Sequence, residues 1–220
     1  MPLVNCLEIP SSESDFPEAR LLLREFSHRV NNEFASAIAA ISIAATRSAS
    51  VEAEAALSAV RNQLQSYAQV HHALQMPEHT ICIDAAIYLR RLCAAISRSR
   101  LESKGIELRL VERTFQMNSE RCWRLGLIVS ELITNAERHA FRSKGGGVIR
   151  VELLPSTSFV ECRITDNGAG EESAIRGRGL GIVESLAKSL GGTIDQHFGP
   201  QGATAVLIFP AEIDTTERLA

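Results

Sequence analysis

The sequence lacks the features that would assign it to several common classes of protein. No apolar run approaches the roughly 18 residues that a membrane-spanning helix needs, and no basic, apolar leader stands at the N-terminus. The net charge is −3, and no stripe of lysine and arginine provides the contacts on which sequence-independent nucleic-acid binding depends. We therefore expect no membrane insertion and no nucleic-acid partner.

Cysteines are few and scattered along the chain. The five are Cys6, Cys82, Cys93, Cys122 and Cys162, with no short paired spacing. An odd, dispersed set is typical of reduced thiols and argues against both a disulfide framework and a zinc site. We therefore expect a cytoplasmic protein. Hydrophobic residues make up 45% of the chain, which is enough to build a packed core and excludes a disordered tail.

The first part of the chain predicts two long helices. No internal proline or glycine interrupts residues 17–47, and apolar side chains recur on one helical face at positions 23, 26, 30, 34, 37, 41 and 44. A short break at Ser48-Ala49-Ser50 offers an N-cap for a second helix. That helix runs to about Gln75, with a heptad seam at positions 57, 60, 64, 67, 71 and 74. A single hairpin of two helices leaves half of its apolar surface exposed. We therefore expect a homodimer in which two hairpins form a four-helix bundle.

The second part of the chain mixes helices and strands. Helices are predicted at 84–103, 119–141 and 180–190, and strands at 106–111, 147–154, 158–165, 192–197 and 203–209. The predicted fold class is α+β: an N-terminal helical hairpin followed by an α/β sandwich with helices on one face of a sheet. The predicted domains are a hairpin at 17–77 and a sandwich at 80–212, flanked by tails at 1–16 and 213–220.

Polar side chains interrupt the apolar helix predicted at 119–141. Glu131, Asn135 and Arg138 are spaced at i, i+4 and i+7, so they share one side of the helix. A solvated face is the simpler interpretation, but asparagine is a weak helix former in mid-helix. Oxygen donors such as Glu131 and Asn135 suit Mg²⁺ or its bound waters, and Arg138 with His139 could neutralise phosphate oxygens.

Two glycine-rich segments follow in order. Asp166, Gly168 and Gly170 come directly after an apolar strand, where a carboxylate can accept a hydrogen bond from an exocyclic amine. The glycines there permit positive φ and a close approach of ligand to backbone. Gly179 and Gly181 open the last helix, whose free amides can bind phosphate.

Each segment alone could be an ordinary turn or a flexible connection. Their order is more specific: the asparagine helix, the two glycine segments, and then Gly202-Ala203-Thr204 leading into the last strand.

Residues 80–210 resemble the ATP-binding domain of the superfamily that contains gyrase, chaperone, histidine kinase and mismatch-repair ATPases. Residues 131–141 resemble its N box, 166–170 its first glycine box and 177–181 its second. The resemblance implies ATP and Mg²⁺ as cofactors. It assigns the metal to Asn135 and its water shell to Glu131. It assigns the adenine amine to Asp166, the phosphates to Gly179 and Gly181, and the adenine side to Thr204, with Gly168 and Gly170 in the first glycine box.

A histidine on the first helix gives this domain a possible target. Helical periodicity places His28 nearly opposite the apolar seam, with Asn32 one turn away. An isolated surface histidine usually has no function. A neutral imidazole is nevertheless a competent nucleophile, and an ATP-binding domain on the same chain favours that role. His71, on the seam, is predicted to be a packed or capping residue, and the remaining histidines, His72, His79, His139 and His197, lie beside no such motif on the hairpin.

The sequence His-Arg-Val-Asn-Asn, which begins at His28, resembles the His-Arg-x-x-Asn phosphoacceptor motif of one branch of bacterial sensor histidine kinases. The resemblance covers residues 20–210. The Trp-x-Glu pair of the neighbouring HWE-type group is absent. The chain departs from the family pattern at Asn31, where a basic residue is usual, at Glu33 and at Arg138, and its ATP lid between Gly170 and Gly177 has only six residues.

The resemblance implies a protein histidine kinase that phosphorylates His28, with Glu131 and Asn135 as catalytic residues. The phosphoryl group would pass to an aspartate of a response-regulator receiver domain. Only sixteen residues precede the first predicted helix, so we expect either a separate sensor protein or a constitutive dimer. Two alternatives remain open. One is a histidine phosphotransferase with a vestigial ATP domain, and the other is a serine kinase acting as an anti-sigma factor, which would need no histidine hairpin.

Overall fold

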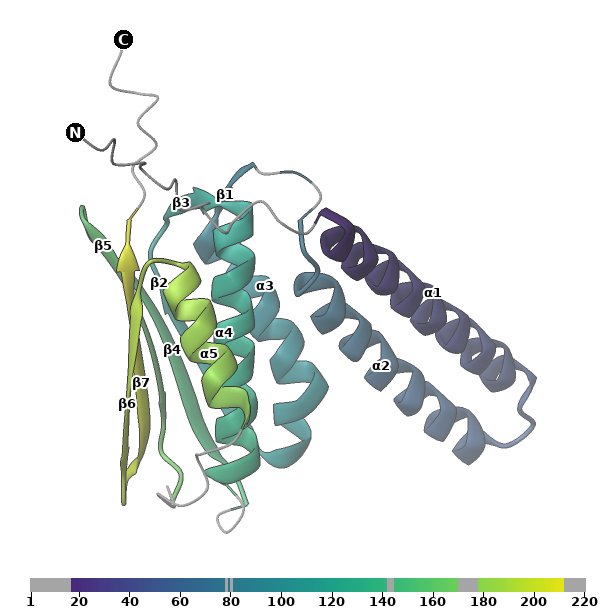
Figure 1. The fold of residues 1–220 in the computed structure, drawn as a ribbon. Helices are drawn as coiled ribbons and strands as arrows, with labels where there is room; N and C mark the ends of the chain where they lie inside the picture. Colours follow the sequence, from purple (N-terminus) through teal and green to yellow (C-terminus); the bar gives the residue numbers. More distant parts are fainter. Residues whose placement is uncertain (1–16, 78, 80, 142–144, 170–177, 212–220) are drawn as a thin grey trace, which may run out of the picture.

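The structure, a computed structural model, describes residues 17–77, 79, 81–141, 145–169 and 178–211. The predicted tails, Gly170 and the whole of the predicted ATP lid lie outside these residues. Two helices, α1 (Pro17–Arg47) and α2 (Val51–Ala73), form the predicted hairpin, which projects from the rest of the chain (Figure 1). The predicted N-cap is confirmed, because the Ser50 hydroxyl accepts a hydrogen bond from the Ala53 backbone N–H at 3.3 Å.

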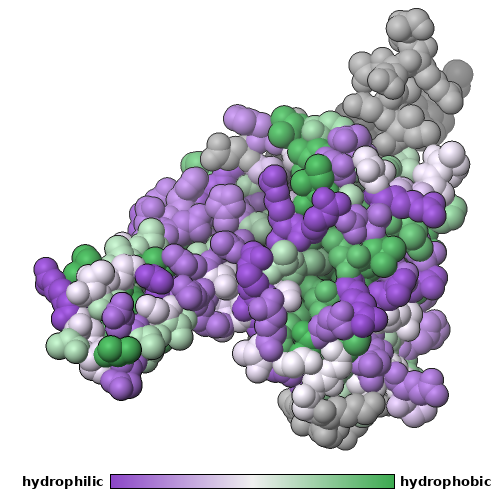
Figure 2. Space-filling model, turned by 180° about the vertical axis from the view of Figure 1, so that it is seen from behind, coloured by the Kyte–Doolittle hydropathy of each residue, from purple (hydrophilic) through white to green (hydrophobic). Residues whose placement is uncertain are grey.

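The predicted seam of α1 is confirmed in part. Four of its seven positions, 30, 34, 37 and 41, are half-buried, and the other half-buried or buried positions of the helix are 24, 27, 31, 38, 42 and 45. Leu23 and Phe26, which were predicted on the seam, are 55% and 64% exposed. On α2, Val60 and Tyr67 are also exposed, and Figure 2 shows hydrophobic side chains on the surface of the hairpin. Most positions of the predicted apolar face are therefore half-buried, whereas the large side chains of Leu23, Phe26, Val60 and Tyr67 remain exposed.

The second domain is built from a five-stranded sheet and three α-helices. Its elements are β1 (Cys82–Asp84), α3 (Ala85–Ile96), β2 (Ile106–Glu112), β3 (Gln116–Asn118), α4 (Ser119–His139), β4 (Gly147–Pro155), β5 (Phe159–Asp166), α5 (Arg178–Ser189), β6 (Thr193–Gly199) and β7 (Gly202–Pro210). The strand order is β2-β4-β5-β7-β6, with β2 and β4 parallel and the other neighbours antiparallel. The helices cover one face of this sheet, as predicted (Figure 1).

Two local features differ from the predictions. The short strands β1 and β3 pair in a separate antiparallel sheet that the sequence pattern did not predict. The helix predicted at 84–103 changes its hydrogen-bonding pattern, because α3 ends at Ile96 and is followed by a π-helical turn, η1 (Ser97–Leu101), and a 3₁₀ turn, η2 (Glu102–Lys104). The predicted stop is confirmed, since Gly105 has a φ of 67°, a conformation that glycine adopts readily.

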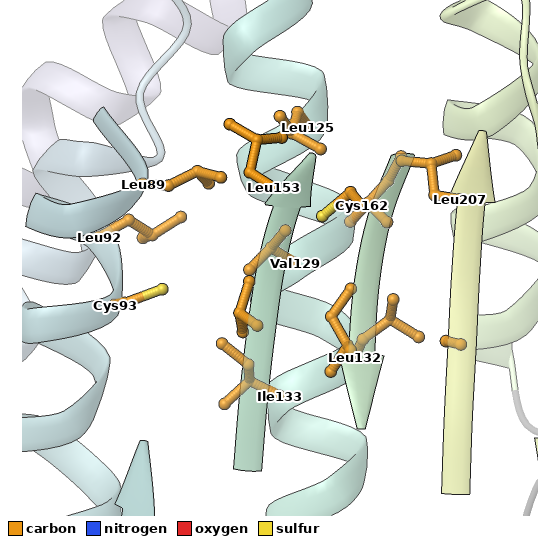
Figure 3. Packing of buried hydrophobic residues seen from close by; sticks show 14 of the residues in the cluster. Leu89, Leu92, Cys93, Leu125, Val129, Leu132, Ile133, Leu153, Cys162 and Leu207 are labelled. Carbon is orange, nitrogen blue, oxygen red and sulfur yellow. The ribbon is translucent and has the colours of Figure 1, made fainter. Parts of the chain in front are cut away.

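The hydrophobic core lies between the helices and the sheet. Alternate residues of β5, Val160, Cys162 and Ile164, are buried beneath α4. Figure 3 shows Leu89 and Leu92 of α3 pointing toward the strand that carries Leu153, with leucines of α4 and Cys162 of β5 in the same core. The cysteines in the described part of the chain are all free, and burial raises the pKa of the Cys93 thiol to about 12.

The second domain and the hairpin meet at the carboxyl end of α2. The Tyr88 hydroxyl donates a hydrogen bond to the Ala73 carbonyl at 2.9 Å, and the Trp123 indole N–H donates to the Leu74 carbonyl at 2.8 Å. These donors satisfy carbonyls that a helix end leaves without an intrahelical partner. Further along α2, the Gln63 amide donates to the Ser99 carbonyl of η1.

Within the described residues, no helix is both long enough and apolar enough to cross a membrane.

Candidate functional site

The polar side of α4 faces away from the core. Glu131, Asn135 and His139 are half-buried and Arg138 is exposed, whereas the neighbouring Leu132 is buried. Arg138 and His139 lie in the last turn of α4. Positive charge is favourable there, because the helix dipole is negative at its carboxyl end. The shared side predicted from the i, i+4 and i+7 spacing is therefore present.

Asp166 lies at the end of β5, on the face of the sheet that the helices cover. Its Oδ1 accepts hydrogen bonds from the backbone N–H groups of Gly168 at 3.0 Å and Ala203 at 3.3 Å. Burial raises the pKa of this carboxyl, against the lowering effect of the two hydrogen bonds. The carboxylate is thus held at the junction of β5 and β7 with one oxygen oriented by the backbone.

Gly168 joins this loop to the end of α4. A Cβ atom at position 168 would lie 2.2 Å from the Ala140 carbonyl oxygen, and the Ala169 N–H donates to that same oxygen at 2.9 Å. The glycine is required by this close approach and not by a positive φ, which Gly168 does not have. The first glycine box is therefore packed directly against the N-box helix.

Asn167 and Gly202 also hold the loop, and the sequence analysis assigned a role to neither. The Asn167 Oδ1 accepts a hydrogen bond from the Val148 N–H at 2.8 Å. Gly202 has a φ of 127°, and a Cβ there would collide with the Asp166 carbonyl. An Asx residue before glycine is a recognised turn signal, so Asn167 could have been found from the sequence.

The predicted role of Thr204 does not fit the strand geometry. In the β5–β7 register Thr204 pairs with Thr165, so both point to the face of the sheet opposite to Asp166. The residue on the same face as Asp166 is Ala203, whose backbone is hydrogen-bonded to it. Phe198, which pairs with Ala203, also shares this face and is half-buried. Ala203 and Phe198 therefore replace Thr204 as candidates for the adenine side.

Residues 178–181 of the second glycine box form the first turn of α5, which begins at Arg178, and Gly177 lies outside the described residues. Gly181 is exposed, and a Cβ at this position would meet no atom within 4 Å. Gly179 lies in the same turn. The amino end of α5 therefore has free space beside Gly181 and backbone N–H groups that the helix itself cannot satisfy.

His28 is exposed on α1, as predicted. Next to it, Arg29 forms an ion pair with Glu25 at 2.9 Å. In Figure 1, α1 lies on the far side of α2 and α3 from α4 and α5. The structure thus brings the residues of α4, the Asp166 loop and α5 to one end of the sandwich, but it does not bring His28 to them.

His71 is packed, as the sequence predicted. Its Nδ1 lies 3.0 Å from the Asn31 Oδ1, and its ring lies 6.0 Å from that of Phe34. Burial lowers the pKa of His71, with a smaller contribution from His72. Asn31, one of the departures from the family motif, is therefore an internal contact of the hairpin.

The donors on α4 fit a metal that keeps part of its water shell. Among the described residues no group of three or more histidine, cysteine or acidic side chains could hold an ion on its own. Glu131 and Asn135 supply a carboxylate and an amide oxygen one turn apart. Mg²⁺ is usually bound in this way, through one or two protein oxygens together with waters and substrate phosphates.

Two family profiles match consecutive parts of the chain. The profile described as "Histidine kinase" matches residues 25–100, and the profile described as "Histidine kinase-like ATPase domain" matches residues 101–209. Together the two profiles match residues 25–209, which include both the hairpin and the sandwich. This chain belongs to the histidine kinase family.

Individual relatives are more distant. The chain is 27% identical to the sensor histidine kinase PdtaS of Mycolicibacterium smegmatis, over 84% of this chain and 38% of the relative. It is 25% identical to blue-light-activated histidine kinase 2 of Erythrobacter litoralis, over 93% of this chain and 62% of the relative. The chain thus spans less than two thirds of the length of either.

Among solved structures, the histidine kinase domain of the Erythrobacter litoralis EL346 blue-light-activated histidine kinase has a similar fold. The TM-score is 0.59 at 22% identity, covering 82% of this chain and 96% of that one.

Proposed function

We propose that this chain is an ATP-dependent protein histidine kinase. It phosphorylates His28 and passes the phosphoryl group to an aspartate of a response-regulator receiver domain. The observation that carries the proposal is the convergence of the N box, the Asp166 loop and the start of α5 at one end of a domain that is joined to an exposed histidine. A serine kinase would not need the hairpin, and the "Histidine kinase" profile matches that part of the chain.

Nucleotide would bind between α4 and α5. Asp166 would accept a hydrogen bond from the adenine amine, because its second oxygen is not used by the backbone contacts of Gly168 and Ala203. The phosphates would lie against the amino end of α5 at Gly179 and Gly181, and the cations of Arg138 and His139 would offset their charge. Gly170 remains in the proposal as the last residue of the first glycine box.

Mg²⁺ would be held by Asn135, with Glu131 orienting its waters. When bound, the metal neutralises charge on the phosphate oxygens. The residues of this chain would then act chiefly by positioning the γ-phosphoryl group and excluding water, which is where most of the catalysis in phosphoryl transfer arises.

The exposed apolar face of the hairpin supports a homodimer. Leu23 and Phe26 of α1 and Val60 and Tyr67 of α2 are large side chains exposed in one chain, and a second hairpin would cover them. Phe26 and His28 are two residues apart, which separates them by about 200° around the helix. Burying Phe26 in a four-helix bundle would therefore leave His28 accessible.

Transfer requires His28 and the nucleotide to meet. Since α1 is remote from α4 and α5 in this structure, the ATP-binding domain must move relative to its own hairpin or serve the hairpin of the partner chain. A sensor, whether a separate protein or another part of a longer chain, would act on this step. The free and mostly buried cysteines support the cytoplasm as the place where the reaction occurs.

Two measurements test the proposal against its main rival, a phosphotransferase that does not bind ATP. Titration with ATP and Mg²⁺ is expected to show saturable binding that Asp166→Asn weakens strongly and that His28→Ala leaves unchanged. Incubation with γ-labelled ATP is expected to give a label that is labile in acid and stable in base, and Asn135→Ala should prevent it. Absence of nucleotide binding by the wild-type protein would favour the relay.

A further inference from the structure

A polar pocket lies on the flank of α4 that faces away from the Asp166 loop. It is enclosed by Lys104 of η2, the start of β2 at Ile106, the last turn of α4 and the glycine turn before β4, and its volume is about 520 Å³. Pockets that bind small organic ligands commonly have volumes of 300–1,000 Å³. The pocket lies at β2, the edge strand, and its neighbour β4, whereas the nucleotide site proposed above lies between α4 and α5, so α4 separates the two.

Positive charge dominates the wall of this pocket. Lys104 and Arg138 line it, and Arg100 lies behind them, within 4.0 Å of Glu137. Glu137 is the acidic residue of the lining. Its side chain is only 9% exposed and is already paired with the Lys104 Nζ at 2.6 Å. An anion entering the pocket would therefore meet two cationic side chains and one largely covered carboxylate.

The remaining walls suit a phosphate that carries an organic group. Gly145 has a φ of 63°, and a Cβ there would meet no atom within 4 Å, so its backbone faces open space where an anion can approach closely. Ile106 and Phe141, which are buried in the core, provide an apolar floor. The volume is much larger than a bare phosphate needs, which leaves room for an organic part against that floor.

We propose that this pocket binds a small phosphate monoester, with Lys104 and Arg138 contacting the phosphate and the apolar floor contacting the organic group. Arg138 also belongs to the nucleotide site in the function proposed above. If that function holds, an occupied pocket draws Arg138 away from the nucleotide and weakens ATP binding. This consequence rests on the proposed function, whereas the binding itself does not.

The test uses phenyl phosphate as the probe and the whole chain labelled with ¹⁵N, without nucleotide. Titration is expected to shift the amide signals of Gly145 and Gly146 in a saturable manner, at lower concentrations than inorganic phosphate requires. Lys104→Met, which keeps the aliphatic stem, should weaken binding about tenfold, as expected for loss of one charge-assisted contact. Lys188→Met, at an exposed lysine on α5, is the matched control and should change nothing.

A second variant separates loss of the site from damage to the fold. Glu137→Gln removes the carboxylate that competes for Lys104, so it should tighten binding even if it lowers thermal stability. Lys104→Met and Glu137→Gln are therefore expected to move the affinity in opposite directions. Unchanged glycine signals, or equal affinity in the wild type and Lys104→Met, would overturn the proposed site. Adding phenyl phosphate should also raise the apparent Kd for ATP, and binding without that rise would overturn the coupling alone.

Discussion

Trp123 of α4 donates its indole N–H to the backbone carbonyl of Leu74, 2.8 Å away at the carboxyl end of α2. Trp123 is the single tryptophan of the chain, and α4 also carries Glu131 and Asn135. One helix thus contacts the hairpin near its amino end and the proposed metal near its carboxyl end. The fluorescence of Trp123 can therefore report on the junction between the two domains.

Removing the neighbouring hydrogen bond should loosen this junction. Tyr88 donates its hydroxyl to the Ala73 carbonyl, and burial raises the pKa of Tyr88, so the hydroxyl stays protonated and remains a donor. Tyr88→Phe is expected to lower the free energy of unfolding by about 1 kcal/mol, measured by urea denaturation with Trp123 fluorescence. Tyr67→Phe, at the other tyrosine, has a hydroxyl with no hydrogen bond among the described residues and should cost much less.

Two glycines of the nucleotide site should respond in opposite ways to alanine. Gly168→Ala would place a methyl group against the Ala140 carbonyl, and it is expected to destabilise the protein by about 1–3 kcal/mol. Gly181→Ala meets open space on a helix, so it should stabilise the free protein by up to about 1 kcal/mol while weakening nucleotide binding. Thermal unfolding with and without ATP measures both effects. Equal stability of the two variants would contradict the close packing of Gly168 on α4.

The carboxyl of Asp166 predicts a pH-dependent difference in stability. Burial raises its pKa in the folded state, so the folded protein holds this proton more tightly than the unfolded chain does. Below the ordinary aspartate pKa of about 3.9, the contribution of this proton to the free energy of unfolding is fully present. The contribution is lost as the pH rises through the higher pKa that Asp166 has in the folded state.

At neutral pH Asp166→Asn, which retains an oxygen acceptor, should therefore raise the melting temperature of the nucleotide-free protein. This difference in melting temperature should shrink as the pH falls toward the ordinary aspartate pKa. The variant should fail to bind nucleotide at every pH. A lower melting temperature at neutral pH would show that the ionised carboxylate stabilises the site instead.

The exposed positions of the predicted α1 seam, Leu23 and Phe26, show where sequence reasoning reached its limit. Helix boundaries followed from the apolar period and from Ser50, because both act locally. The side that meets α2 is partly polar, with Asn31 paired to His71, whereas Leu23 and Phe26 point outward. An apolar pattern alone cannot distinguish a surface that packs within the chain from one that packs against a second chain.

The outline of the nucleotide site could be predicted because its motifs are local in the sequence. Asp166, Asn135 and the glycines belong to local motifs, so their order along the chain indicated one site. Thr204 was misplaced because a difference of one residue in a strand reverses the face of the sheet, and only the register with β5 fixes that face. Glu137 and Lys104 were not found, since their contact joins segments 33 residues apart.

The outward face of the hairpin should control dimerisation. Phe26→Lys is expected to convert a dimer into a monomer without unfolding the hairpin, because Phe26 is 64% exposed in the single chain and its loss leaves no cavity within the hairpin. Leu21→Lys, at a similarly exposed leucine on the side of His28, is the matched control and should remain dimeric. Sedimentation equilibrium measures the outcome. A dimer of unchanged affinity in Phe26→Lys would place the interface elsewhere.

The central claim is that His28 accepts the phosphoryl group of ATP. It is tested most directly by labelling His28→Ala and His72→Ala with γ-labelled ATP, since both positions are exposed histidines of the hairpin. The account predicts acid-labile label on the wild type and on His72→Ala, and none on His28→Ala, which still binds ATP with unchanged affinity. Label that persists on His28→Ala, or that survives acid treatment, would contradict it.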